Sequence, residues 1–256
     1  MKAIKVGIVG CGGRMGRMLV AEIAATKGFA LAGGTEQAGL DPAGIKISAD
    51  PAALFKVSDA VVDFTTPKAT LAHARLAAKT GKALIVGTTG LGKDHLAALR
   101  AAAKKAVVVQ AANMSVGVNV LLGLTEQVAR MLGPDYDIEI VEMHHRMKVD
   151  APSGTALALG SAAAAGRGVD LAKVAQRVRD GITGPRRTGD IGFAVLRGGD
   201  VAGDHTVVFA GYGERVELAH KASSRAVFAK GAIRAVKWTR GKKPGFYTMR
   251  NVLGFD

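Results

Sequence analysis

The stretch Val6-Gly7-Ile8-Val9-Gly10-Cys11-Gly12-Gly13-Arg14-Met15-Gly16 decides the fold of this chain. Apolar residues run directly into glycines, and a helical pattern opens behind them. Glycines permit a tight turn there and let a pyrophosphate approach the backbone N–H groups at a helix N-terminus. Met15 stands where the strict G-x-G-x-x-G pattern has its third glycine, but the spacing Gly10, Gly13, Gly16 holds. We therefore expect a dinucleotide-binding turn between a strand and a helix.

Short β-branched runs alternate with alanine- and leucine-rich stretches over roughly the first 110 residues. Strands are expected at residues 4–9, 29–35, 60–64, 83–86 and 107–110, and helices at residues 15–27, 51–55, 68–80 and 93–105. Apolar strands separated by helices indicate a parallel sheet that is covered on both faces. The fold class is therefore α/β, with a Rossmann-type doubly wound parallel sheet.

The pattern changes after Asn113. A long helix is expected over residues 116–132, and strands over 137–143, 191–196, 206–210 and 215–220, with no regular helix between the last three. In the first of these strands, alternation predicts that Ile138, Ile140 and Met143 are buried and that Glu139 and Glu142 face solvent. Successive strands without a crossover helix indicate a second α+β domain built on a mixed or antiparallel sheet.

The last helix, expected over residues 224–239, could pack back on the first sheet. Residues 1–115 and 225–256 would then form the dinucleotide-binding domain, and residues 116–224 the second domain. A glycine-rich loop is expected over residues 181–189.

Composition limits the class of protein. The 256 residues are 48% hydrophobic and 22% charged, which is ordinary for a globular protein and excludes a disordered basic tail as the source of the charge. The 35 Lys and Arg against 21 Asp and Glu give a net charge of +14. This excess of positive charge could bind nucleic acid, an anionic membrane surface or small anionic ligands.

The single cysteine, Cys11, excludes an internal disulfide. The chain has no run of about 18 apolar residues that could span a bilayer. Its first residues pass straight into a strand pattern without the apolar core of a signal peptide. We therefore expect a protein of the reducing cytoplasm.

Glu36 lies 20 residues after Gly16, at the end of the second expected strand. An acidic side chain there can accept hydrogen bonds from the adenosine ribose, although a solvated turn glutamate is the simpler alternative. Gln37 carries no positive charge for a 2′-phosphate, whereas Arg14 could supply one. The choice between NADH and NADPH stays open at this point, with NADH favoured.

Three further strand ends carry small and hydroxyl-bearing residues that would let a nicotinamide ring approach the backbone. Each taken singly is also compatible with ordinary turn chemistry, although ligands of open α/β sheets bind at this edge. These segments are Asp63-Phe64-Thr65-Thr66, Gly87-Thr88-Thr89-Gly90 and Ala111-Ala112-Asn113-Met114-Ser115.

The densest chemistry lies between Glu142 and Ala156. His144, His145, Arg146 and Lys148 form a cationic cluster, and Ser153-Gly154-Thr155 opens a helix. A titratable histidine can transfer protons, and N–H groups at a helix start can hold a carboxylate. The segment therefore suits a small substrate with more than one carboxylate.

Two alternatives for this cluster are a zinc site and a nucleic-acid surface. Adjacent histidines on a strand point to opposite faces, the H-E-x-x-H pattern is absent, and the segment has no aromatic residue for base stacking. We therefore expect no metal, no nucleic-acid partner and no membrane partner. The remaining histidines have no comparable polar neighbours in sequence and are expected to be structural or exposed: His73, His95, His205 and His220.

These motifs resemble the 4-hydroxy-tetrahydrodipicolinate reductase (dihydrodipicolinate reductase) family over essentially the whole chain. The most specific is E-x-x-E-x-H-x-x-x-K-x-D-x-P-S-G-T-A, which starts at Glu139. The other matching segments are residues 10–16, 63–65, 87–90, 111–119, 192–193, 203–206 and 220–225. The resemblance implies NADH- or NADPH-dependent reduction of a cyclic imine dicarboxylate, with loss of water, in the diaminopimelate route of lysine biosynthesis.

The resemblance also implies residue roles. His144 would be the proton donor and acceptor and Lys148 a second proton donor, while His145, Gly154 and Thr155 would bind the substrate carboxylates. Residues 116–224 would bind substrate and build a homotetramer. The cofactor would be held by Gly10, Cys11, Gly12, Gly13, Arg14, Met15, Glu36, Gly87, Thr88, Thr89, Ala111, Ala112, Asn113 and Met114.

One departure concerns the cofactor. Many family members that use both cofactors have an arginine after the ribose-binding acid, and this chain has Gln37. Two rivals remain: a redox-sensing Rossmann nucleic-acid binder, which would need a helix-turn-helix that we do not find, and an aspartate-type amino-acid dehydrogenase. The intact segment from Lys148 to Thr155 argues against the dehydrogenase.

Overall fold

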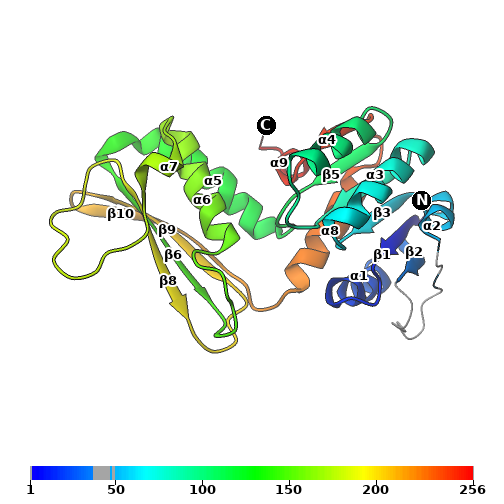
Figure 1. Ribbon diagram of the computed structural model, residues 1–256, viewed down its shortest axis with the longest axis horizontal. Helices are drawn as coiled ribbons and strands as arrows, with labels where there is room; N and C mark the ends of the chain where they lie inside the picture. Colours follow the sequence, from blue (N-terminus) through cyan, green and yellow to red (C-terminus); the bar gives the residue numbers. More distant parts are fainter. Residues whose placement is uncertain (1, 37–46, 48–49, 256) are drawn as a thin grey trace. The chain divides into compact units, whose positions relative to one another are not determined.

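The computed structural model describes residues 2–36, 47 and 50–255. The chain forms two compact units, Met1–Val116 with Ala226–Asp256, and Gly117–Arg225. Both ends of the chain, blue and orange to red in Figure 1, therefore belong to the same unit.

The first unit is built on a parallel sheet whose described strands follow the order β11-β5-β4-β3-β1-β2. The chain leaves β1 toward β2 on one side and returns to β3 on the other, so the direction of winding changes at β1. The α/β doubly wound class expected from the alternation is confirmed. The strands are β1 (Ile4–Val9), β2 (Phe29–Thr35), β3 (Ala60–Asp63), β4 (Ala83–Val86), β5 (Val107–Gln110) and β11 (Gly245–Tyr247). The helices are α1 (Arg14–Ala25), α2 (Pro51–Val57), α3 (Pro67–Thr80), α4 (Lys93–Ala102), α8 (Ala226–Trp238) and α9 (Met249–Leu253).

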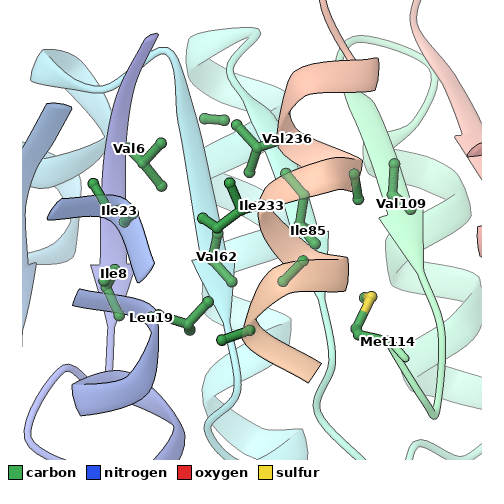
Figure 2. Packing of buried hydrophobic residues seen from close by; sticks show 14 of the residues in the cluster. Val6, Ile8, Leu19, Ile23, Val62, Ile85, Val109, Met114, Ile233 and Val236 are labelled. Carbon is green, nitrogen blue, oxygen red and sulfur yellow. The ribbon is translucent and has the colours of Figure 1, made fainter. Parts of the chain in front are cut away.

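Helices cover both faces of this sheet because its strands are apolar on both sides. Alternate residues of one strand enter different cores: Val62 lies in the core with α1 and α8, and Val61 in the core with α2, α3 and α4. Figure 2 shows Ile233 and Val236 of α8 beside Val62 and Ile85. The last long helix thus completes the core that the first strand begins.

The second unit holds a mixed sheet in the order β10-β9-β6-β8-β7. Strand β6 pairs parallel with β8 and antiparallel with β9, as expected for a mixed sheet. Its strands are β6 (Asp137–His144), β7 (Ala175–Gln176), β8 (Ile191–Arg197), β9 (Asp204–Gly211) and β10 (Glu214–Lys221). Its helices are α5 (Val116–Leu132), which begins at the last residue of the first unit, a 3₁₀ turn (Gly133–Asp135), α6 (Gly154–Arg167) and α7 (Leu171–Val174).

One expectation about β6 is wrong. Ile138, Ile140, Glu142 and His144 share the buried face, whereas Met143 lies on the other face, only partly buried. The strand keeps a strict period of two, and Glu142 can remain inside because an arginine and other donors bind its carboxylate. The short elements β7, α7, β11 and α9 were not expected at all. Among the described residues, no helix is long and apolar enough to cross a membrane.

Candidate active site

The glycine turn follows β1 and opens α1. The N–H groups of Gly10 and Cys11 both donate to the Thr35 carbonyl, at 2.8 and 3.1 Å, which fixes the turn to the end of β2. Gly10 has a φ of +74°, in the left-handed region that favours glycine. Gly13 is the N-cap of α1 and has no side chain to cap the first amides. The turn therefore presents helix N–H groups in the way that an anion requires.

Gly16 explains the altered glycine spacing. A Cβ on Gly16 would lie 2.2 Å from the Gly10 carbonyl oxygen and 2.6 Å from the Cys11 Cα. The third glycine of this turn is needed for close packing of the helix against the turn, so it stands at position 16, and Met15 is tolerated.

A cavity of about 380 Å³ lies at the carboxyl edge of β1, β2 and β3. This volume is in the range of small-molecule sites. Of the expected cofactor residues, Gly10, Gly13 and Glu36 line the cavity, and the Gly12 N–H donates to Glu36 Oε2 at 2.7 Å. The uncapped helix start, the glycine turn and the acidic side chain fit a dinucleotide. Gln37, on which the NADH argument depends, lies outside the described residues.

The other expected cofactor segments occupy the same edge of the sheet. Gly87 to Thr89 follow β4 directly, and Ala111 to Met114 follow β5. The Gly87 N–H donates to the Asp63 carbonyl, and the Ala111 N–H donates to the Val86 carbonyl. These bonds hold the two segments to the strand ends, but neither segment lines the cavity.

A buried polar cluster lies beneath this edge. The sequence singled out three of its members as strand-end residues, Asp63, Thr65 and Thr88, but gave no indication that they meet His73 and Thr70. Asp63 is fully buried and lies 2.8 Å from His73 Nδ1, while the hydroxyls of Thr65, Thr70 and Thr88 lie 2.6 to 3.1 Å from its carboxylate. Burial alone would raise the pKa of Asp63, but the hydrogen bond and the charge of His73, with the hydrogen bonds of Thr65 and Thr70, outweigh it and lower the pKa. His73 also lines the cavity, so the cluster connects β3, α3 and the segment after β4 to the candidate cofactor site.

The second unit carries the residues expected to act as acid and base, at and after the end of β6. His144 is buried, and its Nδ1 lies 2.6 Å from Glu142 Oε2. Burial lowers the pKa of His144, the Glu142 carboxylate opposes this, and Lys148 and Arg197 lower it further. Burial would raise the pKa of Glu142, but hydrogen bonds from Arg197, His144 and the Ser153 N–H lower it. An ionised carboxylate only accepts hydrogen bonds, so the proton between the pair sits on His144 Nδ1.

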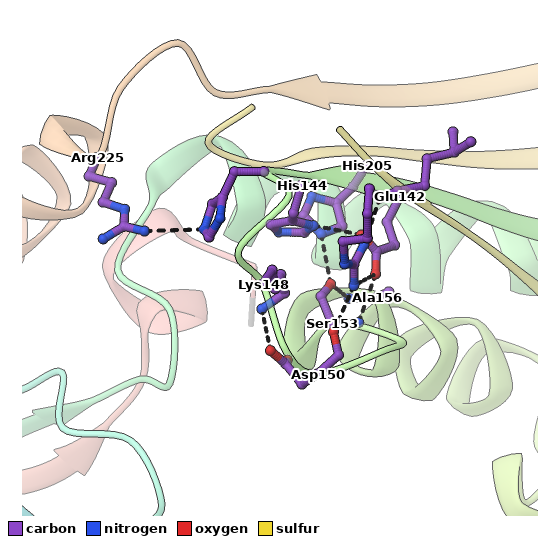
Figure 3. Close-up of polar contacts among 11 residues, drawn as sticks. Glu142, His144, Lys148, Asp150, Ser153, Ala156, His205 and Arg225 are labelled. Atoms are coloured by element: carbon purple, nitrogen blue, oxygen red, sulfur yellow. Dashed lines mark hydrogen bonds and ion pairs between the residues drawn. The ribbon is translucent and has the colours of Figure 1, made fainter. Parts of the chain in front are cut away.

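Ser153 and His205 complete the buried part of this site. Ser153 caps α6 by accepting the Ala156 N–H at 3.1 Å, and its hydroxyl lies 3.1 Å from His205 Nε2. The His205 ring packs edge-on against His144, with centroids 5.0 Å apart. Burial, and then the charge of His144, lowers the pKa of His205 to about 4 against the opposing charge of Glu142, so His205 is neutral at physiological pH. Figure 3 shows these residues converging beside the start of α6.

The remaining expected residues surround this buried group. Lys148 Nζ pairs with Asp150 Oδ1 at 2.7 Å, and His145 Nε2 lies 3.4 Å from Arg225 Nη2. Gly154 is the first residue of α6 and is exposed, and a Cβ there would meet no atom within 4 Å. The fold therefore gathers a buried histidine, a lysine and a helix N-terminus at one end of the second unit. Within the described ranges, no three potential metal-binding side chains gather in one place.

Four residues of these sites were overlooked or misplaced in the sequence analysis: Glu142, Arg197, His205 and His73. His73 and His205 were expected to be structural or exposed, and both are buried, but each also has a polar partner in space that its sequence neighbours did not indicate. Arg197 lies 55 residues from its partner Glu142, and His205 lies 52 residues from its partner Ser153, so no local sequence pattern joins either pair. A usable local signal existed only for His73, which follows Asp63 by ten residues and lies in the middle of the next helix.

Known proteins resemble this chain along its full length. The family model described as dihydrodipicolinate reductase, N-terminus, matches residues 4–114, and the model for the C-terminus matches residues 117–253. The 4-hydroxy-tetrahydrodipicolinate reductase of Rhodopseudomonas palustris (strain HaA2) is 52% identical, with 99% of this chain and 98% of the relative covered. The same enzyme of Dinoroseobacter shibae is 52% identical, with 96% and 97% covered.

Solved structures show the same fold at lower identity. A dipicolinate-bound dihydrodipicolinate reductase from Paenisporosarcina sp. TG-14 is 22% identical, has a TM-score of 0.82 and covers 97% of this chain and 99% of its own. An aspartate dehydrogenase from Thermotoga maritima is 13% identical, with a TM-score of 0.52 and coverage of 94% and 98%. The fold thus extends to dehydrogenases, but the sequence match is with the reductases.

Proposed function

The chain belongs to the dihydrodipicolinate reductase family, and we propose that His144 and Lys148 carry the proton chemistry of its reaction. The protein is an NAD(P)H-dependent oxidoreductase of lysine biosynthesis by the diaminopimelate route. It reduces 4-hydroxy-tetrahydrodipicolinate to tetrahydrodipicolinate with loss of water. When bound, the nicotinamide group supplies the hydride, and the chain must hold both ligands and deliver a proton.

The observation that carries the proposal is the hydrogen bond from His144 Nδ1 to Glu142 beside the start of α6. With Nδ1 engaged by the carboxylate, Nε2 is the atom that exchanges a proton with the substrate. Lys148 carries a second mobile proton on its ammonium group, and Asp150 restrains the side chain that bears it. The two residues thus offer two proton sources close to one helix N-terminus.

Substrate carboxylates would bind to His145, Gly154 and Thr155. The amides at the start of α6 favour an anion, and the absence of a side chain on Gly154 leaves space for one. The nearby charges of Lys148 and Arg225 are also positive. A cyclic dicarboxylate therefore suits this end of the second unit better than a neutral or cationic substrate.

The cofactor would be held by the glycine turn from Gly10 to Met15, by Glu36, and by the segments Gly87 to Thr89 and Ala111 to Met114. The uncapped N-terminus of α1 would take the pyrophosphate, and Glu36 would accept the ribose hydroxyls. We favour NADH because Gln37 carries no charge for a 2′-phosphate. Values of kcat/KM measured with NADH and with NADPH test this, and a clear preference for NADPH would contradict it.

We also propose that the enzyme is a cytoplasmic homotetramer, with residues 116–224 as the substrate-binding and assembly domain. Val195 and Leu196 of β8 are 37% and 50% exposed, and exposed apolar side chains favour burial against another copy. Light scattering on the purified protein tests the assembly, and a monomer at micromolar concentration would overturn it. Cell fractionation tests the location.

The test of the catalytic roles is His144→Gln, assayed with enzymatically generated substrate. We expect kcat to fall about 10²-fold, the scale of a lost general acid, with little change in the KM for NADH. An unchanged kcat would remove His144 from the mechanism.

Lys148→Ala should damage both kcat and the substrate KM, because a charge and a proton are lost together. The matched control is Lys173→Ala, on an exposed face of α7 in the same unit, which should leave both constants unchanged. Equal effects of the two lysine variants would show that Lys148 acts only through the general charge of the surface.

A further inference from the structure

Four N–H donors converge on the two oxygens of the buried Glu142 carboxylate. Oε2 lies 2.6 Å from His144 Nδ1 and 2.8 Å from Arg197 Nη1, and Oε1 lies 3.0 Å from Arg197 Nη2 and 2.9 Å from the Ser153 N. The Glu142 side chain is 1% exposed. Only a carboxylate can accept hydrogen bonds at both of its oxygens without donating any, so these four donors require an acidic side chain at position 142.

The partners of Glu142 belong to different parts of the candidate site. His144 is the proposed proton donor, and Ser153 is the N-cap of the helix whose first residues would hold the substrate. One carboxylate therefore fixes the ring that delivers the proton and the backbone that would orient the acceptor. Arg197 supplies the positive charge that keeps this carboxylate ionised inside the protein.

The opposite side of the His144 ring has space beside Nε2. A Cβ on Gly203 would lie 3.0 Å from His144 Nε2, and Gly203 has a φ of +152°. A glycine here keeps side-chain atoms away from Nε2, while Glu142 holds Nδ1. In the His144 ring, Nδ1 is therefore bound to Glu142, and Nε2 stays accessible to a substrate.

We propose that Glu142 is a positioning residue for the reduction: it holds His144 in the Nδ1–H tautomer and fixes the ring relative to the start of α6. The proposal rests on the catalytic role assigned to His144 above. Glu142 does not touch substrate, and it acts through the two groups that it binds. Arg197 supports it by neutralising the buried charge.

The discriminating variant is Glu142→Gln, which keeps the shape of the side chain but has one carbonyl oxygen for four donors. Whichever way the amide turns, an NH₂ group faces either His144 Nδ1 or the Arg197 and Ser153 donors. We expect kcat to fall about 10²-fold, the scale of an acid–base histidine that has lost its orienting partner, with the KM for NADH within about twofold of wild type.

Glu139→Gln is the matched control. Glu139 lies on the same strand and its carboxylate also binds arginines, Arg179 at 2.8 Å to each oxygen and Arg186 at 3.0 Å. Its neutralisation breaks comparable ion pairs without contact to His144. We expect Glu139→Gln to keep the wild-type kcat, and a loss equal to that of Glu142→Gln would mean that any broken ion pair on β6 disables the enzyme.

Nitrogen NMR of histidine-labelled protein provides a readout that does not need activity, with the His144 signals assigned by their loss in His144→Gln. The charged or titratable groups that act on His144 are Glu142 of β6, Arg197 of β8, Lys148 after β6 and His205 of β9. In wild type we expect the Nδ1–H tautomer. Glu142→Gln should lower the His144 pKa by about one unit or more, because a negative charge is removed.

Arg197→Gln should move the His144 pKa in the opposite direction, upward, because a positive charge is removed. A merely structural Glu142 would leave the tautomer and the pKa of His144 unchanged in Glu142→Gln, and that result would overturn the proposal whatever happens to kcat. If His144→Gln retained activity while the NMR changes were as expected, the catalytic assignment would fail and the positioning of the ring would stand.

Discussion

At the residue scale, the glycine turn after β1 can form only because Gly16 has no Cβ. A methyl group there would overlap the Gly10 carbonyl oxygen, at 2.2 Å, and the obstructing atoms are backbone that cannot turn aside. We expect Gly16→Ala to lower the free energy of unfolding by about 2 kcal/mol, the cost of overpacking, and to weaken NADH binding. Urea unfolding and fluorescence titration with NADH measure the two effects.

Gly13→Ala provides the comparison for this prediction. The same methyl group would there meet the Gly10 carbonyl oxygen at 3.4 Å, a contact that small shifts accommodate, and the φ of −68° suits alanine. The loss of an N-cap glycine should cost less than about 1 kcal/mol. Equal destabilisation of the two variants would show that helix packing on the turn is not what requires Gly16.

At the element scale, the cluster around Asp63 connects β3 with α3. The lowered pKa of Asp63 means that its ionised form stabilises the fold above its ordinary pKa of about 3.9, and this contribution is lost as the pH falls through the lower native value. His73→Ala removes the partner that offsets burial, so the native pKa of Asp63 rises. Acid unfolding should therefore begin at a higher pH, as circular dichroism would show.

The free energy of unfolding at neutral pH should fall by about 3 kcal/mol, because a buried carboxylate loses a hydrogen-bond partner. His95→Ala is the control, since His95 Nδ1 accepts the backbone N–H of Gly92 on the neighbouring helix. An acid transition of His73→Ala that coincides with wild type would show that the threonine hydroxyls alone hold Asp63 ionised.

The individual elements also show which parts of the fold can be predicted from the sequence. Periodicity was sufficient for the long strands and helices of both sheets, because their apolar faces repeat within one element. It was insufficient for Glu142: a strict period of two puts this residue on the face of Ile138 and Ile140, but its charge led to the prediction that it faces solvent. Its actual place depends on Arg197, 55 residues away. The three-residue strand β11 and the short helix α9 were missed because they are too short to show a period.

At the scale of the whole molecule, the second unit is an insertion into the first. The chain leaves the first unit at Val116 and returns at Ala226, and α8 then fills the core of the first sheet. The two crossing points are near one another, because Gly231 of α8 is packed directly against the Met114 carbonyl, where a Cβ would lie 1.7 Å from the oxygen. A short linker should therefore be able to join the two chain ends in place of the whole insertion.

We expect a protein in which a short Gly/Ser linker replaces residues 117–225 to fold and to bind NADH, because the glycine turn, Glu36 and both cores of the first unit are retained. It should have no reductase activity, since His144 and Lys148 are removed.

The control is a chain that ends at Arg225. It keeps the second unit but lacks α8, so Val62 and Ile85 no longer pack against Ile233 and Val236. Cooperative thermal unfolding and NADH fluorescence should distinguish the two, with the truncated chain aggregating. If the truncated chain bound NADH as tightly as the linked one, the first unit would not need its C-terminal part, and the core that α8 shares with β1 and β3 would contribute nothing to the cofactor site.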